Sequence, residues 1–147
     1  MGFARGVALA PPLPVTAKSK FNVSIFNGTK NSITLPGEGC SWGYDIVSFE
    51  LVSPNEKSQK ITQKPKAWYK NALVTDNTPS TGLVIRKINF GDGTWQGLPV
   101  RVSGQTYGWK IKVKVNVPSD SLSTEKVFWI GKMESKFIHA KIVNTQD

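Results

Sequence analysis

The chain has 147 residues and a formal net charge of +9, from 19 lysines and arginines against 10 acidic residues. Its hydrophobic content of 39% is too high for a disordered chain, and its length suits one domain with its own core. No apolar run approaches the roughly 20 residues of a membrane-spanning helix, and the single cysteine, Cys40, excludes an intrachain disulfide.

Residues 1–20 are expected to form an extended, irregular arm. Glycine, alanine and the proline cluster between Pro11 and Pro14 disfavour regular structure and favour an extended path. Arg5, Lys18 and Lys20 give this arm a mild positive charge. We therefore predict an N-terminal arm over 1–20 and one folded domain over 21–147.

The remaining chain has the pattern of short strands separated by glycine, proline and asparagine. Residues 21–35 predict two strands joined as a hairpin at Asn27-Gly28, because both residues tolerate the positive φ angles of tight turns. We expect a long polar loop over 76–82 and a turn over 90–95. The other strands are predicted at 45–52, 59–63, 67–74, 83–90, 100–103, 107–117, 126–130 and 136–143.

No segment of 12 or more residues shows a clean helical period. Many short strands with frequent turn signals indicate an all-β protein built as an antiparallel β-sandwich or barrel. The sequence shows no internal repeat, which argues against a propeller or a β-trefoil. We predict a β-sandwich, with a jelly roll as the favoured topology.

The segment 107–117 has the clearest pattern in the chain. Three lysines alternate with Ile111, Val113 and Val115, and successive side chains of a strand point to opposite faces. Pro118 ends the run. The pattern predicts a strand with its aliphatic face in a core and its lysine face toward solvent or an anion.

Signals for an enzyme are weak. His139 is the only histidine, and strand parity places it on the same face as Lys141, which favours a surface imidazole over a catalytic base. Asp92 lies between two glycines and lacks companions at calcium-loop spacing, so a turn aspartate is expected. We predict no catalytic residue, no metal site and no cofactor.

The lysines are better candidates for a function. A field this positive attracts nucleic acid, anionic membrane or acidic glycans. A solvated strand face that discourages aggregation is the competing interpretation. The candidate nucleic-acid-binding residues are Arg5, Lys18, Lys20, Lys64, Lys66, Lys70, Lys110, Lys112 and Lys114.

Aromatic residues also gather in or beside the predicted loops. Such side chains stack on sugars or bases, or lie at a lipid headgroup boundary. Alternatively, they close the ends of the sandwich or pack between subunits. The candidate ligand or interface aromatics are Trp42, Tyr44, Trp68, Tyr69, Trp95 and Tyr107.

A proline-bearing basic arm over 1–20, a first hairpin over 21–35 and a closing strand over 137–143 make up the layout of the chain. This layout resembles the small single-jelly-roll coat proteins of simple icosahedral viruses, including satellite viruses. The resemblance implies a structural role, in which lysines face inward to phosphate and aromatics seal subunit contacts. Many arms of that family are richer in arginine than this one.

Two functional hypotheses follow. The first is a capsid protein of the virion that self-assembles and contacts nucleic acid electrostatically, with itself and RNA or DNA as partners. The second is a lectin-like or lipid-binding β-sandwich protein, secreted or at the cell surface, that binds glycan or membrane through loop aromatics and lysines. Particle size and bound nucleic acid distinguish the two.

Overall fold

The computed structural model describes residues 5–8, 13–15, 19–27, 33–36, 43–66, 75–78, 83–98, 108–117 and 131–142. Within these ranges every regular element is a strand, except the single 3-10 turn η1 (Phe90–Asp92). The predicted all-β class is therefore confirmed.

The larger sheet carries the strand predicted over 107–117. Its central strand is β10 (Trp109–Val117), which pairs with β5 (Val47–Val52) on one side. On the other side β10 pairs with both β11 (Gly131–Glu134) and β12 (Ile138–Ile142). Beyond β5 lie β6 (Ser58–Gln63) and β9 (Trp95–Gln96), and beyond β12 lies β2 (Leu13–Val15). All pairings are antiparallel except β2 with β12, which is parallel.

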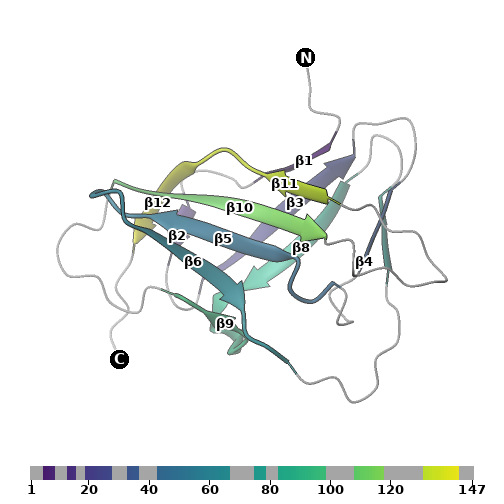
Figure 1. Cartoon of the computed structure of the whole chain (residues 1–147), viewed down its shortest axis with the longest axis horizontal. Helices are drawn as coiled ribbons and strands as arrows, with labels where there is room; N and C mark the ends of the chain where they lie inside the picture. Colours follow the sequence, from purple (N-terminus) through teal and green to yellow (C-terminus); the bar gives the residue numbers. More distant parts are fainter. Residues whose placement is uncertain are drawn as a thin grey trace.

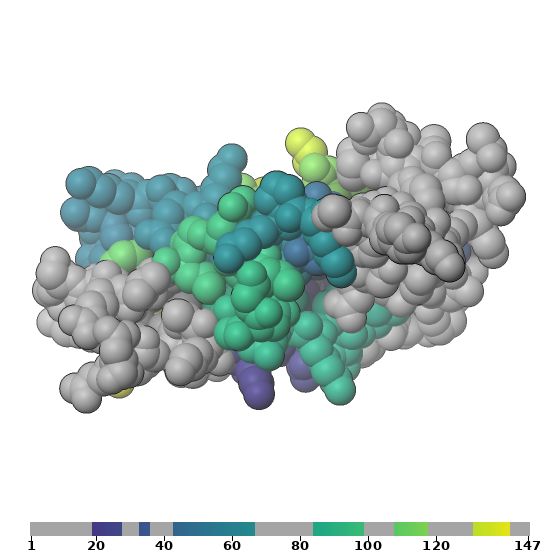
Figure 2. All heavy atoms as spheres, turned by 90° about the horizontal axis from the view of Figure 1, so that it is seen from below, coloured from purple at the N-terminus to yellow at the C-terminus, as the bar shows by residue number. Residues whose placement is uncertain are grey.

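A second layer lies across the first (Figure 1). It contains β1 (Arg5–Ala8), β3 (Lys20–Asn27) and β8 (Leu83–Asn89) in that spatial order. A separate pair is formed by β4 (Ile33–Pro36) and β7 (Thr75–Thr78). In the space-filling view from below, the β9 segment and the end of β6 lie against one another beside β8 (Figure 2).

The core lies between the two layers. Aliphatic residues of β3, β5 and β10 meet there, and Val23, Leu51 and Ile111 have no exposed surface. Four aromatic rings pack at one end with centroids 5.2 to 5.6 Å apart, mostly edge to face: Phe21, Phe49, Phe90 and Trp95. Two sheets packed over one core confirm the predicted sandwich.

One charged residue is buried among the described core side chains. Arg86 of β8 is 4% exposed, and its Nη1 donates a hydrogen bond to the Gly43 carbonyl at 3.0 Å. Arg86 and Ile88 are two residues apart on β8, so they share one face of the strand, and both are buried. This hydrogen bond links the second layer to the turn that precedes β5.

The predicted hairpin over 21–35 is wrong in its pairing. Both strands exist, but β3 pairs with β1 and β8, whereas β4 pairs with β7. A turn signal at Asn27-Gly28 acts only locally. The register between β3 and β8 runs from Lys20 opposite Asn89 to Phe26 opposite Leu83, and pairing of that length outweighs a two-residue preference.

The expected irregular arm also contains two strands. Arg5–Ala8 pairs antiparallel with β3, and Leu13–Val15 pairs parallel with β12. Both are edge strands of their sheets, where proline is tolerated because one side of the strand makes no ladder hydrogen bonds. Pro14 therefore fits within β2.

Three other short strands arise where the sequence predicted none. β7 overlaps the start of the expected polar loop, β9 overlaps the end of the expected turn, and β11 lies between two predicted strands. Their pairing partners are distant in sequence, so no local pattern identifies them. The predicted strands over 67–74, 100–103 and 126–130 lie outside the described residues.

Candidate polyanion-binding face

The structure confirms the prediction that β10 has one buried aliphatic face and one outward lysine face. Trp109, Ile111, Val113, Val115 and Val117 are all at most 8% exposed. Its three lysines point away from the core: Lys110, Lys112 and Lys114. The alternation positions them because side chains two residues apart share one face of the sheet.

Neighbouring strands add further charges to the same outer face. In register, Lys110 lies opposite His139, Lys112 opposite Glu50, and Lys114 opposite Glu134. Glu50 in turn lies opposite Lys60 of β6. We call this surface the lysine face. It contains Glu50, Glu134, His139, Lys60, Lys110, Lys112, Lys114, Lys132 and Lys141.

Two glutamates form ion pairs with the lysines in the middle of the lysine face. Lys114 Nζ lies 2.9 Å from Glu50 Oε1 and 3.8 Å from Glu134 Oε1, and Lys112 Nζ lies 3.4 Å from Glu134 Oε2. The hydrogen bond from Lys114 lowers the pKa of Glu50. Burial raises this pKa, but nearby lysine charges lower it further, so the pKa of Glu50 lies below its usual value. The same hydrogen bond raises the pKa of Lys114.

The rest of the lysine face is not neutralised in this way. Among the residues that the structure describes, Lys60, Lys132 and Lys141 form no ion pair with a carboxylate. Six lysines thus face outward with two glutamates between them. The arrangement leaves a net positive surface that is available to an anion.

Phe137 adds an aromatic ring to the lysine face. The ring is 37% exposed, and the Nζ atoms of Lys112 and Lys110 lie 4.8 and 5.2 Å from its centroid. These distances are within the range of cation–π attraction. The sequence analysis does not identify Phe137 as a candidate, because it selects only aromatic residues in or beside predicted loops; strand parity with His139 and Lys141 is the signal that could have found it.

A hollow of about 260 Å³ lies beside this ring. It is formed where the ends of β10 and β12 meet the turn between β5 and β6. Its lining includes Lys110, Phe137 and His139 from the lysine face and Glu56 from the turn. His139 is exposed, as its parity with Lys141 predicted.

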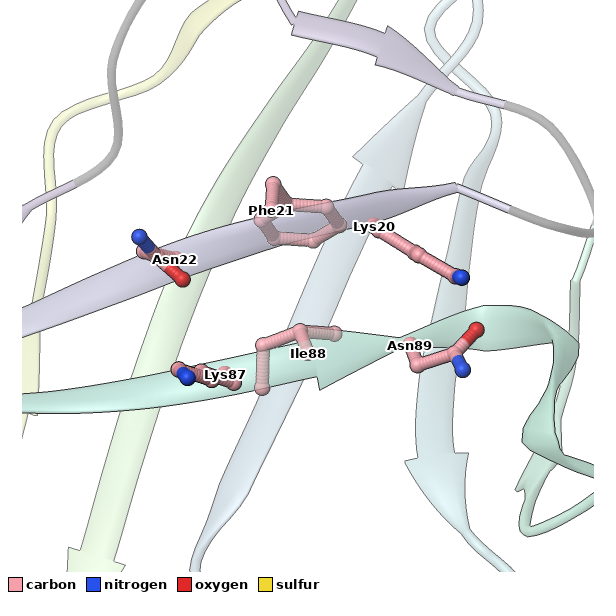
Figure 3. A pocket seen from close by; sticks show the side chains of 6 residues that line it. All are labelled: Lys20, Phe21, Asn22, Lys87, Ile88 and Asn89. Atoms are coloured by element: carbon pink, nitrogen blue, oxygen red, sulfur yellow. The ribbon is translucent and has the colours of Figure 1, made fainter.

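A second hollow, of about 460 Å³, lies on β3 and β8 (Figure 3). Lys20 and Asn89 lie at one end of it, and Asn22 and Lys87 at the other. Asn89 Oδ1 already accepts a hydrogen bond from the backbone N–H of Gly91 at 2.9 Å. Lys20, a predicted nucleic-acid contact, is therefore on the opposite layer from the lysine face.

The remaining predicted cations do not gather with β10. Lys64 and Lys66 are exposed in the segment that follows β6, and Lys66 Nζ lies 5.4 Å from the centroid of the Tyr44 ring. Arg5 lies in β1, but its side chain is not described. Lys18 and Lys70 lie outside the described residues.

Of the two interpretations given for the loop aromatics, Trp95 fits the second, in which the side chain closes one end of the sandwich, and not a ligand or partner contact. Trp95 is 4% exposed and packs against Phe49 and Phe90, because β9 pairs with β6 and turns the indole toward the core. Tyr44 is half-buried in the turn over 43–45. The predicted aromatics Trp42, Trp68, Tyr69 and Tyr107 lie outside the described residues.

Two kinds of feature are absent from the described residues. No group of three or more His, Cys, Asp or Glu side chains is placed to hold a metal ion. No described helix is long and apolar enough to span a bilayer.

Fold and site together define a β-sandwich protein with a cationic outer sheet face. No protein-family model matches the chain, and searches of curated proteins and of solved structures found no similar protein.

Proposed function

We propose that the protein is a self-assembling coat protein whose lysine face binds the phosphates of nucleic acid. A jelly-roll topology and a location in the virion belong to the same proposal. The observation that carries it is the lysine face itself, in which six outward lysines from four strands surround two glutamates.

The geometry suits binding that does not depend on base sequence. Alternate lysines on one strand are about 6.8 Å apart, and neighbouring strands are about 4.8 Å apart. A lysine ammonium acts as a point charge rather than as the planar fork with which arginine reads a base. A grid of such charges attracts a phosphate chain in many registers, as packaging of nucleic acid requires.

The lectin or membrane alternative depends on exposed aromatics. Of the described candidates, Trp95 lies in the core and Tyr44 is half-buried beneath Lys66. The described side chains therefore give less support to glycan or lipid binding than to phosphate binding. A monomer that binds liposomes or glycans and no nucleic acid would favour this alternative.

Assembly is tested by light scattering and by the 260/280 absorbance ratio of freshly purified protein. The proposal expects a particle many times the mass of one chain that carries nucleic acid. A clean monomer at high concentration, with or without added nucleic acid, would contradict self-assembly.

Phosphate binding is tested by titrating a labelled single strand at several salt concentrations. Lys60→Gln and Lys132→Gln should each weaken binding and lower the salt slope by about 0.7 for the phosphate contact removed. Lys87→Gln, on the opposite layer, is the matched control with the same loss of charge. Equal weakening by all three variants would mean that net charge, not the lysine face, controls binding.

A further inference from the structure

The hollow beside Phe137 has three kinds of group in its lining. Phe137 supplies an aromatic ring, Lys110 a cation and Glu56 a carboxylate, and Pro54 and His139 also line it. Its volume of about 260 Å³ is below the roughly 300 to 1,000 Å³ of pockets that enclose a whole small molecule. It therefore has room for one part of a larger ligand.

Glu56 occupies a backbone position that is unfavourable for it. Its φ angle is 65°, and it is the one described non-glycine residue in the left-handed region. The turn is closed by hydrogen bonds of 2.9 Å from Glu56 N to Ser53 O and from Ser53 N to Lys57 O. Glycine adopts this conformation without strain. Residues held in sparsely populated backbone regions are found preferentially at binding and catalytic sites.

The carboxylate also indicates what enters the hollow. Glu56 repels a phosphate, so phosphates are expected at the lysines outside rather than within the hollow. A neutral, flat group with hydrogen-bond donors suits a hollow whose lining includes both Glu56 and Phe137. Unpaired bases stack on aromatic side chains in this way while their edges form hydrogen bonds.

We infer that the hollow holds one unpaired, amino-bearing base of the bound strand. The base stacks on Phe137, its amino group donates to Glu56, and the adjoining phosphate lies at Lys110. Cytosine and adenine carry such an amino group, whereas uracil does not. This inference rests on the proposed function, because it names which part of the nucleic acid enters which part of the lysine face.

The test compares three labelled single strands of equal length and charge: oligo(C), oligo(U) and an abasic strand. We expect oligo(C) to bind about fivefold or more tightly than the abasic strand, with oligo(U) between them. Phe137→Leu should remove most of the advantage of oligo(C) over the abasic strand. Lys110→Gln should weaken the binding of all three strands.

Glu56→Gly is the decisive variant, because it removes the carboxylate and also removes the backbone strain of a non-glycine residue at positive φ. It should abolish the preference for oligo(C) over oligo(U) in a protein that is more stable to urea. Glu50→Gln is the matched control, since it also removes one negative charge from the same side of the sheet. It should strengthen binding of all three strands and leave the preference unchanged.

The outcomes separate this inference from the proposed function. Salt-dependent binding of all three strands with equal affinity overturns the base site and leaves phosphate binding in place. Equal loss of all three strands in Phe137→Leu also overturns it, because the ring would then act only through its lysines. Failure of every strand to bind at low salt overturns the proposed function, and the inference with it.

Discussion

Lys114 Nζ donates a hydrogen bond to Glu50 Oε1 across the pairing of β10 with β5, at 2.9 Å. Glu50 lies in register with Lys112 on one side and Lys60 on the other, so one carboxylate lies among three lysines. Like charges in adjacent positions of a sheet repel one another. Glu50 therefore makes a dense lysine face compatible with a folded sheet.

We predict that Glu50→Gln lowers the free energy of unfolding by less than about 1 kcal/mol at neutral pH, because the pair is partly exposed to solvent. The folded-state pKa of Glu50 is lowered from 4.5, so its contribution is fully present above pH 4.5 and is lost as pH falls through the lowered value. Urea unfolding of both proteins at about pH 7 and about pH 3 measures the difference. A difference of the same size at both values would contradict the ion pair as its source.

The opposite pH dependence applies to Lys114. Its folded-state pKa is raised from 10.5, so its contribution to stability is fully present below pH 10.5 and declines as pH rises through the raised value. Lys114→Gln should therefore lower stability at neutral pH by an amount similar to Glu50→Gln. In the double variant the two losses should not add, because either change alone removes the same pair.

Gly97→Ala should lower the free energy of unfolding by about 2 kcal/mol or more. Gly97 has a φ angle of 82°, and a Cβ atom there would overlap the carbonyl oxygen of Lys60. Gly93→Ala is the control, since its φ angle is 86° and nothing lies within 4 Å of an added Cβ. Gly93→Ala should lower the free energy of unfolding by only about 1 kcal/mol, the cost of a non-glycine residue at positive φ. Equal losses in urea unfolding would show that the close approach to Lys60 has no effect.

Trp95→Ala should lower the free energy of unfolding by about 3 to 5 kcal/mol, because it opens a cavity in the aromatic cluster with Phe49 and Phe90. Trp95→Phe keeps a ring in place and should lose less. Both are measured by urea unfolding and near-UV circular dichroism. A stable Trp95→Ala variant that loses ligand binding alone would restore the interpretation of Trp95 as a binding residue.

Glu56→Gly should raise the free energy of unfolding by about 1 kcal/mol, because glycine adopts the left-handed conformation without strain. Lys57→Gly is the matched control in the same turn. Its φ angle is not positive, so the change should lower stability. Thermal unfolding of the two variants measures the effect, and destabilisation by both would mean that the Glu56 side chain stabilises the turn.

The sequence predicts features that depend on local alternation. Lysines and aliphatic residues alternate along β10 itself, so its two faces could be assigned without knowledge of its neighbours. The pairing of the strands cannot be predicted in this way. β3 pairs with β8, which is far away in the sequence, and a local turn signal contains no information about so distant a partner. The sequence also leaves the role of Trp95 open for the same reason, since its burial depends on the pairing of β9 with β6.

The hollow beside Phe137 was beyond sequence reasoning. It joins the turn at Glu56 to the ends of two strands near Lys110 and His139, and those three segments meet only in the folded sheet. The positive φ angle of Glu56 could not be predicted from the sequence, because glycine or asparagine, and not glutamate, usually indicates such an angle. The charge pattern alone identified the surface but not this feature within it.

The parallel pairing of β2 with β12 has a consequence for folding. β12 lies between β2 and β10, so β2 is connected to the larger sheet only through β12. Residues 13–15 therefore cannot take their native place before residues 138–142 are available to pair with them. Because these two segments are widely separated in sequence, this edge of the sheet is expected to form late in folding.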